Sequence, residues 1–181
     1  MLRTPTDQQR FSAATRSRLA VVPVDGDAPR AIGESGVFYA WTVSPDDRNV
    51  VVETGDDFPL RFPYGLFPSD VEIRSMDGGA VAKVGTMPLN DRSAISSVAS
   101  LGPRTWGWAP DGSALYYFSW QDTPGADFAK AIRDTTLPQP GTDRLMRLDA
   151  PFKGRAGAGR DVGLPVCRDG VDRRRKGPRA A

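Results

Sequence analysis

The chain has 181 residues, of which 39% are hydrophobic and 25% charged, a composition ordinary for one globular domain. Its 16 Pro and 19 Gly favour many turns and short strands over long helices. The sequence contains no histidine, which excludes a Ser-His-Asp triad, a Cys-His pair and any His-containing zinc site within these residues. The single cysteine, Cys167, excludes a disulfide within the chain.

The charge is unevenly distributed along the chain. The formal net charge is +2, but the segment from Lys153 to Ala181 carries nine Lys or Arg against three Asp. Its basic run, Arg173 to Lys176, would suit a nucleic acid, yet no aromatic residue follows Phe152 to stack on a base. We therefore predict a solvated, disordered basic tail over residues 154–181, and no nucleic-acid partner.

No apolar stretch reaches the length of a membrane span, and residues 1–7 lack the apolar core of a signal peptide. From these features we expect no membrane partner. They leave the localisation of the protein unknown.

Two kinds of hairpin motif occur along the chain, each of them twice. The strand pattern of Leu19–Val24 leads into Asp25-Gly26, and that of Val71–Met76 leads into Asp77-Gly78. Between and after these come Pro-Asp turns, Trp41-Thr42-Val43-Ser44-Pro45-Asp46-Asp47 and Trp106-Gly107-Trp108-Ala109-Pro110-Asp111-Gly112. Pro presets φ in a turn and Asp-Gly tolerates positive φ, so both motifs are typical of β-hairpins.

Combined in chain order, these motifs predict a unit of strand, Asp-Gly turn, strand, connection, strand, Pro-Asp turn and strand. Four strands make one blade of a β-propeller. A third unit is expected to begin at Asp143–Asp149. The predicted fold is all-β: an incomplete β-propeller over residues 1–153, with about two four-stranded blades and the start of a third.

The segment Phe58–Pro68 combines aromatic residues with three prolines, so we expect an ordered loop packed over a blade rather than a central strand. Within it, Arg61 is the candidate substrate-binding residue, where it would meet an acidic ligand. A surface salt bridge is the alternative. The ring set of Trp106, Trp108, Tyr116 and Phe118 is expected to form core between stacked blades, rather than a binding platform.

Two acidic pairs, Asp46-Asp47 and Asp56-Asp57, could act in acid/base chemistry or hold calcium. Turn aspartates usually accept hydrogen bonds from the backbone, and we favour that role here. A Gly-x-Ser-x-Gly elbow and a phosphate-binding loop are both absent from the sequence. We therefore predict no catalytic residue, no metal site and no cofactor.

A series of short motifs follows in order along residues 2–153. The motifs are Leu2-Arg3-Thr4-Pro5, Leu19–Gly26, Val43–Asp46 with Val51–Thr54, Phe67-Pro68 before Val71–Ile73, Met87–Leu89, and Gly102–Arg104 ahead of Trp106–Trp108. In this order they resemble the N-terminal propeller of the prolyl oligopeptidase family of serine peptidases, and within it the glutamyl endopeptidase-like branch. The sequence departs from the family around Asp56 to Tyr64.

In that family the propeller caps a C-terminal α/β-hydrolase domain and restricts entry to peptides. The resemblance implies a non-catalytic piece of such a peptidase, whose partners would be a peptide substrate or the missing α/β-hydrolase domain. It carries over no catalytic residue. The glutamyl branch implies cleavage after Glu by the whole enzyme.

Two other interpretations stay open: a freestanding interaction module that recruits a partner by strand addition, and a nucleic-acid-associated protein acting through the basic tail. We also expect the isolated chain to self-associate through uncovered blade faces. The tail beyond about Arg155 is expected to be disordered and to arise from a shift of reading frame, because the strand pattern stops soon after Leu148.

Overall fold

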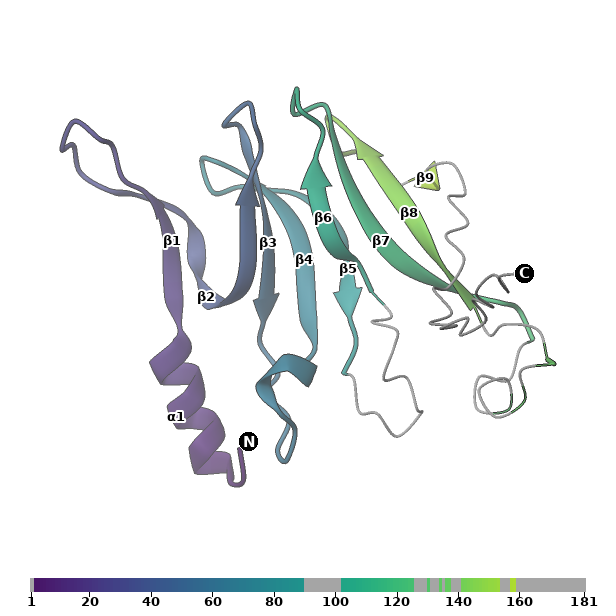
Figure 1. Cartoon of the computed structure of the whole chain (residues 1–181). Helices are drawn as coiled ribbons and strands as arrows, with labels where there is room; N and C mark the ends of the chain where they lie inside the picture. The colour runs from purple at the N-terminus through teal and green to yellow at the C-terminus, as the bar shows by residue number, and fades with distance from the viewer. Residues whose placement is uncertain are drawn as a thin grey trace, which may run out of the picture.

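The computed structural model describes residues 2–89, 102–125, 130, 134, 136–137, 141–153 and 157–158 (Figure 1). The described elements are mostly strands, and every strand pairing is antiparallel. In chain order they are α1 (Pro5–Thr15), β1 (Ser17–Val21), β2 (Arg30–Val43), β3 (Asn49–Gly55), the 3-10 turn η1 (Tyr64–Leu66), β4 (Ser69–Ser75), β5 (Ala80–Met87), β6 (Arg104–Trp108), β7 (Ala114–Asp122), β8 (Gly141–Asp149) and β9 (Gly157–Ala158).

The strands form two sheets, ordered β1-β2-β3-β4-β5 and β6-β7-β8-β9. Strand β2 belongs to two pairings, because residues 30–36 pair with β1 whereas residues 37–43 pair with β3. It bends sharply between these parts (Figure 1). We call residues 17–36 the β1 hairpin, residues 37–43 with β3, β4 and β5 the main sheet, and β6 to β9 the second sheet.

The run Val50-Val51-Val52 forms the centre of the main sheet. All three residues are buried, and β3 pairs with β2 on one side and with β4 on the other. Successive side chains of a strand point to opposite faces, so a continuous apolar run requires cover on both faces. This sheet is therefore the middle layer of the molecule.

The two faces of the main sheet carry separate cores. Val51, Val71 and Ile73 pack against the second sheet, where Leu115 and Tyr117 are buried. On the opposite face, Val50 and Val52 form a cluster with Ile32, against which other residues of the β1 hairpin pack. Three β layers thus lie face to face, and burying these side chains is the main favourable term that holds them together.

The structure corrects the predicted grouping of hairpins. The Pro-Asp hairpin of β2 and β3 pairs through β3 with the Asp-Gly hairpin that follows it, β4 and β5, so the predicted unit does not end after β3. The reason is the pairing of β3 with β4, which runs from Asn49↔Ser75 to Thr54↔Asp70 and bridges the connection of residues 56–68.

The predicted start of a third unit at Asp143–Asp149 is also wrong. This segment is β8, which pairs with β7 along its whole length, from Ala114↔Asp149 to Asp122↔Gly141. The short strand β9 then pairs with β8 at Gly157 and Ala158. These two residues fall in the segment predicted to be a disordered tail, whereas the rest of residues 154–181 lies outside the described residues.

The predicted aromatic set divides between two faces of the second sheet. Trp106 and Trp108 pack into the core toward the main sheet, as expected. The register pairs Trp108 with Leu115 and Gly107 with Tyr116, so Tyr116 and, two residues on, Phe118 lie on the outer face. Leu115 and Tyr117 supply the inward-facing side chains of β7 instead.

Helix α1 was not expected from the composition. Thr4 is its N-cap and forms a capping box with Asp7: the Asp7 amide donates to Thr4 Oγ1 at 3.2 Å, and the Thr4 amide donates to Asp7 Oδ2 at 2.9 Å. Pro5 occupies the first turn, where its missing amide hydrogen costs nothing. The helix packs through Phe11 against the aromatic loop described below.

Candidate functional site

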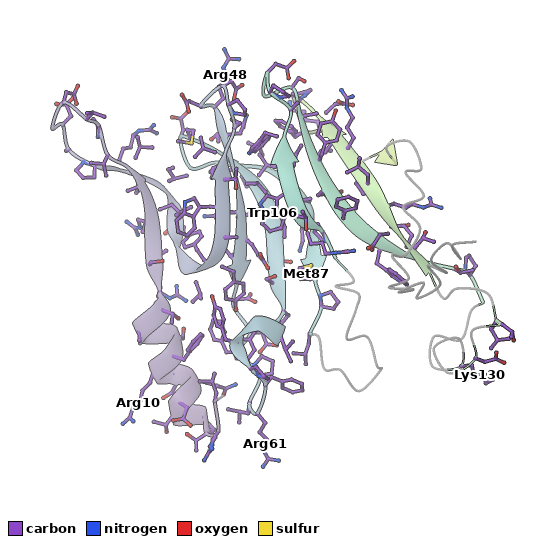
Figure 2. All side chains as sticks on the ribbon, in the orientation of Figure 1. Arg10, Arg48, Arg61, Met87, Trp106 and Lys130 are labelled. Carbon is purple, nitrogen blue, oxygen red and sulfur yellow. The ribbon has the colours of Figure 1, made fainter. Side chains whose placement is uncertain are left out.

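The candidate residue Arg61 lies in the loop of residues 56–68, between β3 and β4. As predicted, this loop is ordered and packed: Phe58 and Phe67 are buried and form a core cluster with Val37. Arg61 itself is exposed, at the end of the molecule opposite to Arg48 (Figure 2). The acidic ligand expected at Arg61 stays a prediction.

Helix α1 holds this loop in place. The Phe11 ring makes edge contacts with Phe58, Tyr64 and Phe67, at centroid distances of 5.0, 6.0 and 6.0 Å. The Gln8 side-chain amide donates to Phe58 O at 2.6 Å. At the tip, the Arg61 amide donates to Leu2 O at 2.7 Å, and Arg61 adopts a positive φ of 69°. The guanidinium is thereby presented from a supported backbone rather than from a free loop.

Acidic groups lie near the base of the same loop. Burial, followed by the charges of Tyr64, Glu53, Asp56 and Asp57, raises the pKa of Tyr39 to about 12. Its hydroxyl is buried without a hydrogen-bond partner in the described part of the chain. The nearby carboxylates disfavour a further negative charge at this place.

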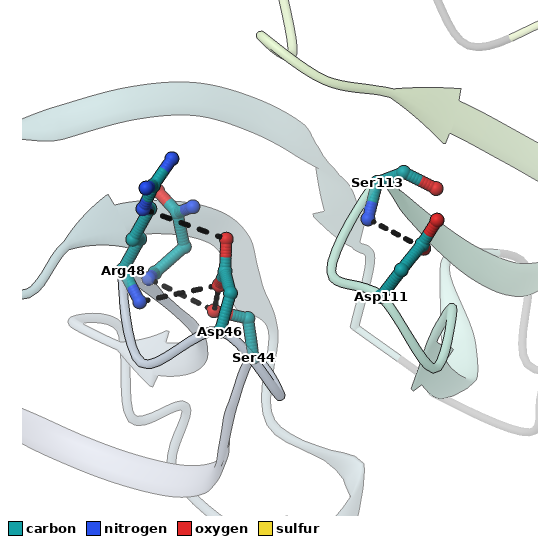
Figure 3. A network of polar contacts seen from close by, with 6 residues as sticks. Ser44, Asp46, Arg48, Asp111 and Ser113 are labelled. Carbon is teal, nitrogen blue, oxygen red and sulfur yellow. Dashed lines mark hydrogen bonds and ion pairs between the residues drawn. The ribbon is translucent and has the colours of Figure 1, made fainter.

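At the other end of the molecule, the two Pro-Asp turns lie side by side (Figure 3). The Ser44 hydroxyl donates to Asp46 Oδ1 at 2.6 Å, and the Arg48 amide donates to the same oxygen at 3.2 Å. In the second turn, the Ser113 amide donates to Asp111 Oδ1 at 3.0 Å. The hydrogen bond from Ser44 holds the pKa of Asp46 below the ordinary value of an aspartate. The hydrogen bond from Ser113 does the same to the pKa of Asp111.

These contacts confirm that Asp46 accepts hydrogen bonds within its turn, as the sequence favoured. A carboxylate held ionised in this way is a poor general acid or base at neutral pH. Among the residues that the structure describes, no group of three or more His, Cys, Asp or Glu side chains is placed to hold a metal ion. No described helix is long and apolar enough to cross a membrane.

Two curated proteins resemble the chain, and both are named "Probable glutamyl endopeptidase, chloroplastic". The protein from Oryza sativa subsp. japonica is 28% identical over 132 residues, which cover 72% of this chain and 14% of the rice protein. The protein from Arabidopsis thaliana is 25% identical over 141 residues, which cover 77% of this chain and 15% of that protein. The chain is distantly related to these proteins.

No family model matches the chain, and no solved structure matches it. The relationship therefore rests on the two curated relatives, and it agrees with the resemblance to the glutamyl endopeptidase-like branch at the level of a distant likeness. Since the chain spans only 14% and 15% of these relatives, the activity of the whole proteins does not transfer to it directly.

Proposed function

We propose that the chain is part of the non-catalytic β-propeller of a glutamyl endopeptidase-like serine peptidase. There it would restrict the access of peptides to an α/β-hydrolase active site supplied by another part of the protein. The observation that carries the proposal is the repeat of antiparallel sheets stacked face to face, in a chain related to two proteins named as probable glutamyl endopeptidases.

The internal repeat supports a propeller. Trp41 in β2 and Trp106 at the corresponding place in β6 are each followed by a Pro-Asp turn that leads into the second strand of its sheet. In both sheets the next strand pairs antiparallel to the hairpin. Four-stranded antiparallel sheets packed face to face are the building units of propellers.

The proposal predicts that the purified chain hydrolyses no peptide, because it has neither a histidine base nor a serine elbow. The measurement is turnover of Glu-containing peptides together with labelling by a fluorophosphonate. Turnover that survives repurification and coincides with a labelled serine would contradict the proposal.

A chimeric protein tests whether the chain restricts access to the active site. The 132-residue matched segment of the rice protein is replaced by the corresponding residues of this chain, and hydrolysis of a short Glu-containing peptide is compared with that of a folded protein substrate. We expect the chimera to cleave the peptide and to spare the folded protein. A control chimera carrying Leu115→Asp, which places a charge in the core between the sheets, should lose this discrimination.

A second candidate function is a freestanding interaction module. The outer edge of β1 favours it, because no other described strand pairs with that edge. A chimera that is folded yet cleaves peptide and folded protein alike would remove the gating role and leave the interaction module. A chimera that cleaves the peptide and spares the folded protein would favour the role as part of a peptidase.

A further inference from the structure

We propose that the chain carries a docking site for a β-hairpin closed by a Pro-Asp turn. It is formed by the edge of β1 that pairs with no described strand, together with Trp41 and Val43. The inference rests on the propeller part of the proposed function and is independent of the peptidase part. It concerns the side of the main sheet that faces the β1 hairpin.

The contact between the main sheet and the second sheet shows how such a site is filled. Trp106 and Trp108 of β6 are partly buried against the core between these sheets. The Trp108 indole Nε1 donates to Thr42 O of β2 at 3.1 Å. A Cβ placed on Gly112 would lie 2.7 Å from Asp46 Cγ, so the two Pro-Asp turns are in close contact. The β2–β3 hairpin thus covers the β6–β7 hairpin.

Trp41 and Val43 are the counterparts of Trp106 and Trp108, sixty-five residues earlier in the chain. Their register, Trp41↔Val52 and Val43↔Val50, places them on the face that carries Val50 and Val52. Val50 and Val52 are 1% and 0% exposed, whereas Trp41 is 56% and Val43 40% exposed. The β1 hairpin therefore covers the β3 part of this face and leaves the β2 part open.

The position of the β1 hairpin explains the uncovered part. Arg30 Nη1 donates to Met76 O at 2.7 Å, which places the start of β2 beside the turn between β4 and β5. Leu19 and Val21 of β1 pack against the cluster that contains Val50 and Val52 of β3. Within the β1 hairpin, β1 is therefore the strand nearer to Trp41 and Val43. The edge of β1 that does not pair with β2 faces these two residues.

A hairpin paired to that edge would cover both side chains and bring the β1 hairpin to four strands, the number in the second sheet. Its chemistry follows from the hairpins that hold the equivalent place in the other sheets, β2–β3 and β6–β7. Each is closed by a Pro-Asp turn and buries side chains on the face toward its neighbour. This edge of β1 supplies backbone hydrogen bonds, and Trp41 is the apolar anchor.

The test uses the full chain and a fluorescent synthetic peptide of residues 37–55, its own β2–β3 hairpin sequence, in a fluorescence anisotropy titration. We expect saturable binding that is about tenfold weaker to the Trp41→Lys chain, because a large aromatic anchor contributes at least about 1.4 kcal/mol. The Tyr116→Lys chain, altered on the outer face of the second sheet, should bind as the unmodified chain does.

A matched peptide carries Val51→Lys, because Val51 lies on the face that the hairpin turns toward its neighbour in the chain. This peptide should bind about tenfold more weakly as well. Equal binding to the unmodified and Trp41→Lys chains, with both folded by circular dichroism, would overturn the proposal. So would the absence of binding, or a stable dimer of the chain that the peptide does not dissociate. None of these outcomes depends on hydrolysis, so they are separate from the chimera experiment.

Discussion

The buried side chain of Tyr39 makes the folding stability of the chain depend on pH in the alkaline range. Its hydroxyl is buried next to Gly55, where a Cβ would collide with the phenol oxygen, and it lacks a hydrogen-bond partner in the described part of the chain. Burial raises its pKa from 10.0 to about 12. A group whose pKa is raised in the folded state contributes stability below its unfolded pKa, and this contribution is lost as pH rises through the folded value.

We therefore expect the chain to lose stability between pH 10 and about 12, and Tyr39→Phe to lose less over the same interval. At neutral pH the Phe variant should be as stable as the unmodified chain or slightly more stable, because it removes an unsatisfied polar atom. Thermal melts from pH 7 to 12 measure both effects, with Tyr116→Phe as the control. A steeper alkaline loss in Tyr39→Phe would contradict this account.

Substitutions at Gly112 and at Gly125, as a control, test whether the two Pro-Asp turns are in contact. Both have positive φ, 72° and 76°, so alanine pays a similar backbone penalty of about 1 kcal/mol at either position. Only Gly112 faces a neighbour, the Asp46 carboxylate, whereas nothing lies within 4 Å of a Cβ at Gly125. Gly112→Ala should therefore destabilise the chain more than Gly125→Ala does in urea unfolding.

The excess destabilisation of Gly112→Ala should shrink when Asp46→Gly is introduced with it, because the colliding side chain is then removed. A double-mutant cycle measures this coupling. Equal destabilisation by the two single alanine variants would mean that the turns do not touch in solution.

The composition did not indicate helix α1, although the sequence contains a clear signal for where this helix begins. Thr4-Pro5-Thr6-Asp7 is a capping box with proline in the first turn. No residue of the helix is fully buried, so an apolar periodicity of the usual strength was not available to reveal it. Its stability instead depends on the cap and on Phe11.

Thr4→Ala should lower the free energy of unfolding by about 1 kcal/mol, because the N-cap side chain no longer accepts the Asp7 amide. Phe11→Ala should cost more, about 2 to 3 kcal/mol, since Phe11 contacts three rings of the 56–68 loop. Chemical denaturation measures both. Gln9→Ala, at an exposed helix position, is the control and should change stability little, because Gln and Ala are both good helix formers. A Phe11→Ala chain as stable as Gln9→Ala would show that α1 does not hold the loop.

At the scale of the whole molecule, the strands and turns were predictable, but their grouping was not. Asp-Gly and Pro-Asp hairpins alternate along the chain, and an alternating pattern does not show where one unit begins. The pairing of β3 with β4 decides it, and Val50-Val51-Val52 was the available signal, because a run buried on both faces needs a strand on each side. Gly157 and Ala158 were not predicted as strand because both residues have weak strand preference.

The way in which the hairpins combine into sheets also changes which surface we expect to drive association of the isolated chain. The sequence indicated Trp106, Trp108, Tyr116 and Phe118, but the first two are covered by the main sheet. Within the part of the chain that the structure describes, Trp41 and Val43 are exposed apolar side chains beside the edge of β1, with which no described strand pairs. Exposed apolar patches next to free backbone groups favour association, so we expect concentration-dependent self-association at tens of micromolar.

Light scattering and sedimentation over a concentration series measure this association. Trp41→Lys should shift the chain toward monomer without lowering its melting temperature, because the side chain is 56% exposed in the folded state. Tyr116→Lys distinguishes the two faces of the molecule: association through the outer face of the second sheet would respond to this variant instead. A sharp monomeric species of the unmodified chain across the whole series would show that the open face is stable in water and needs no second copy.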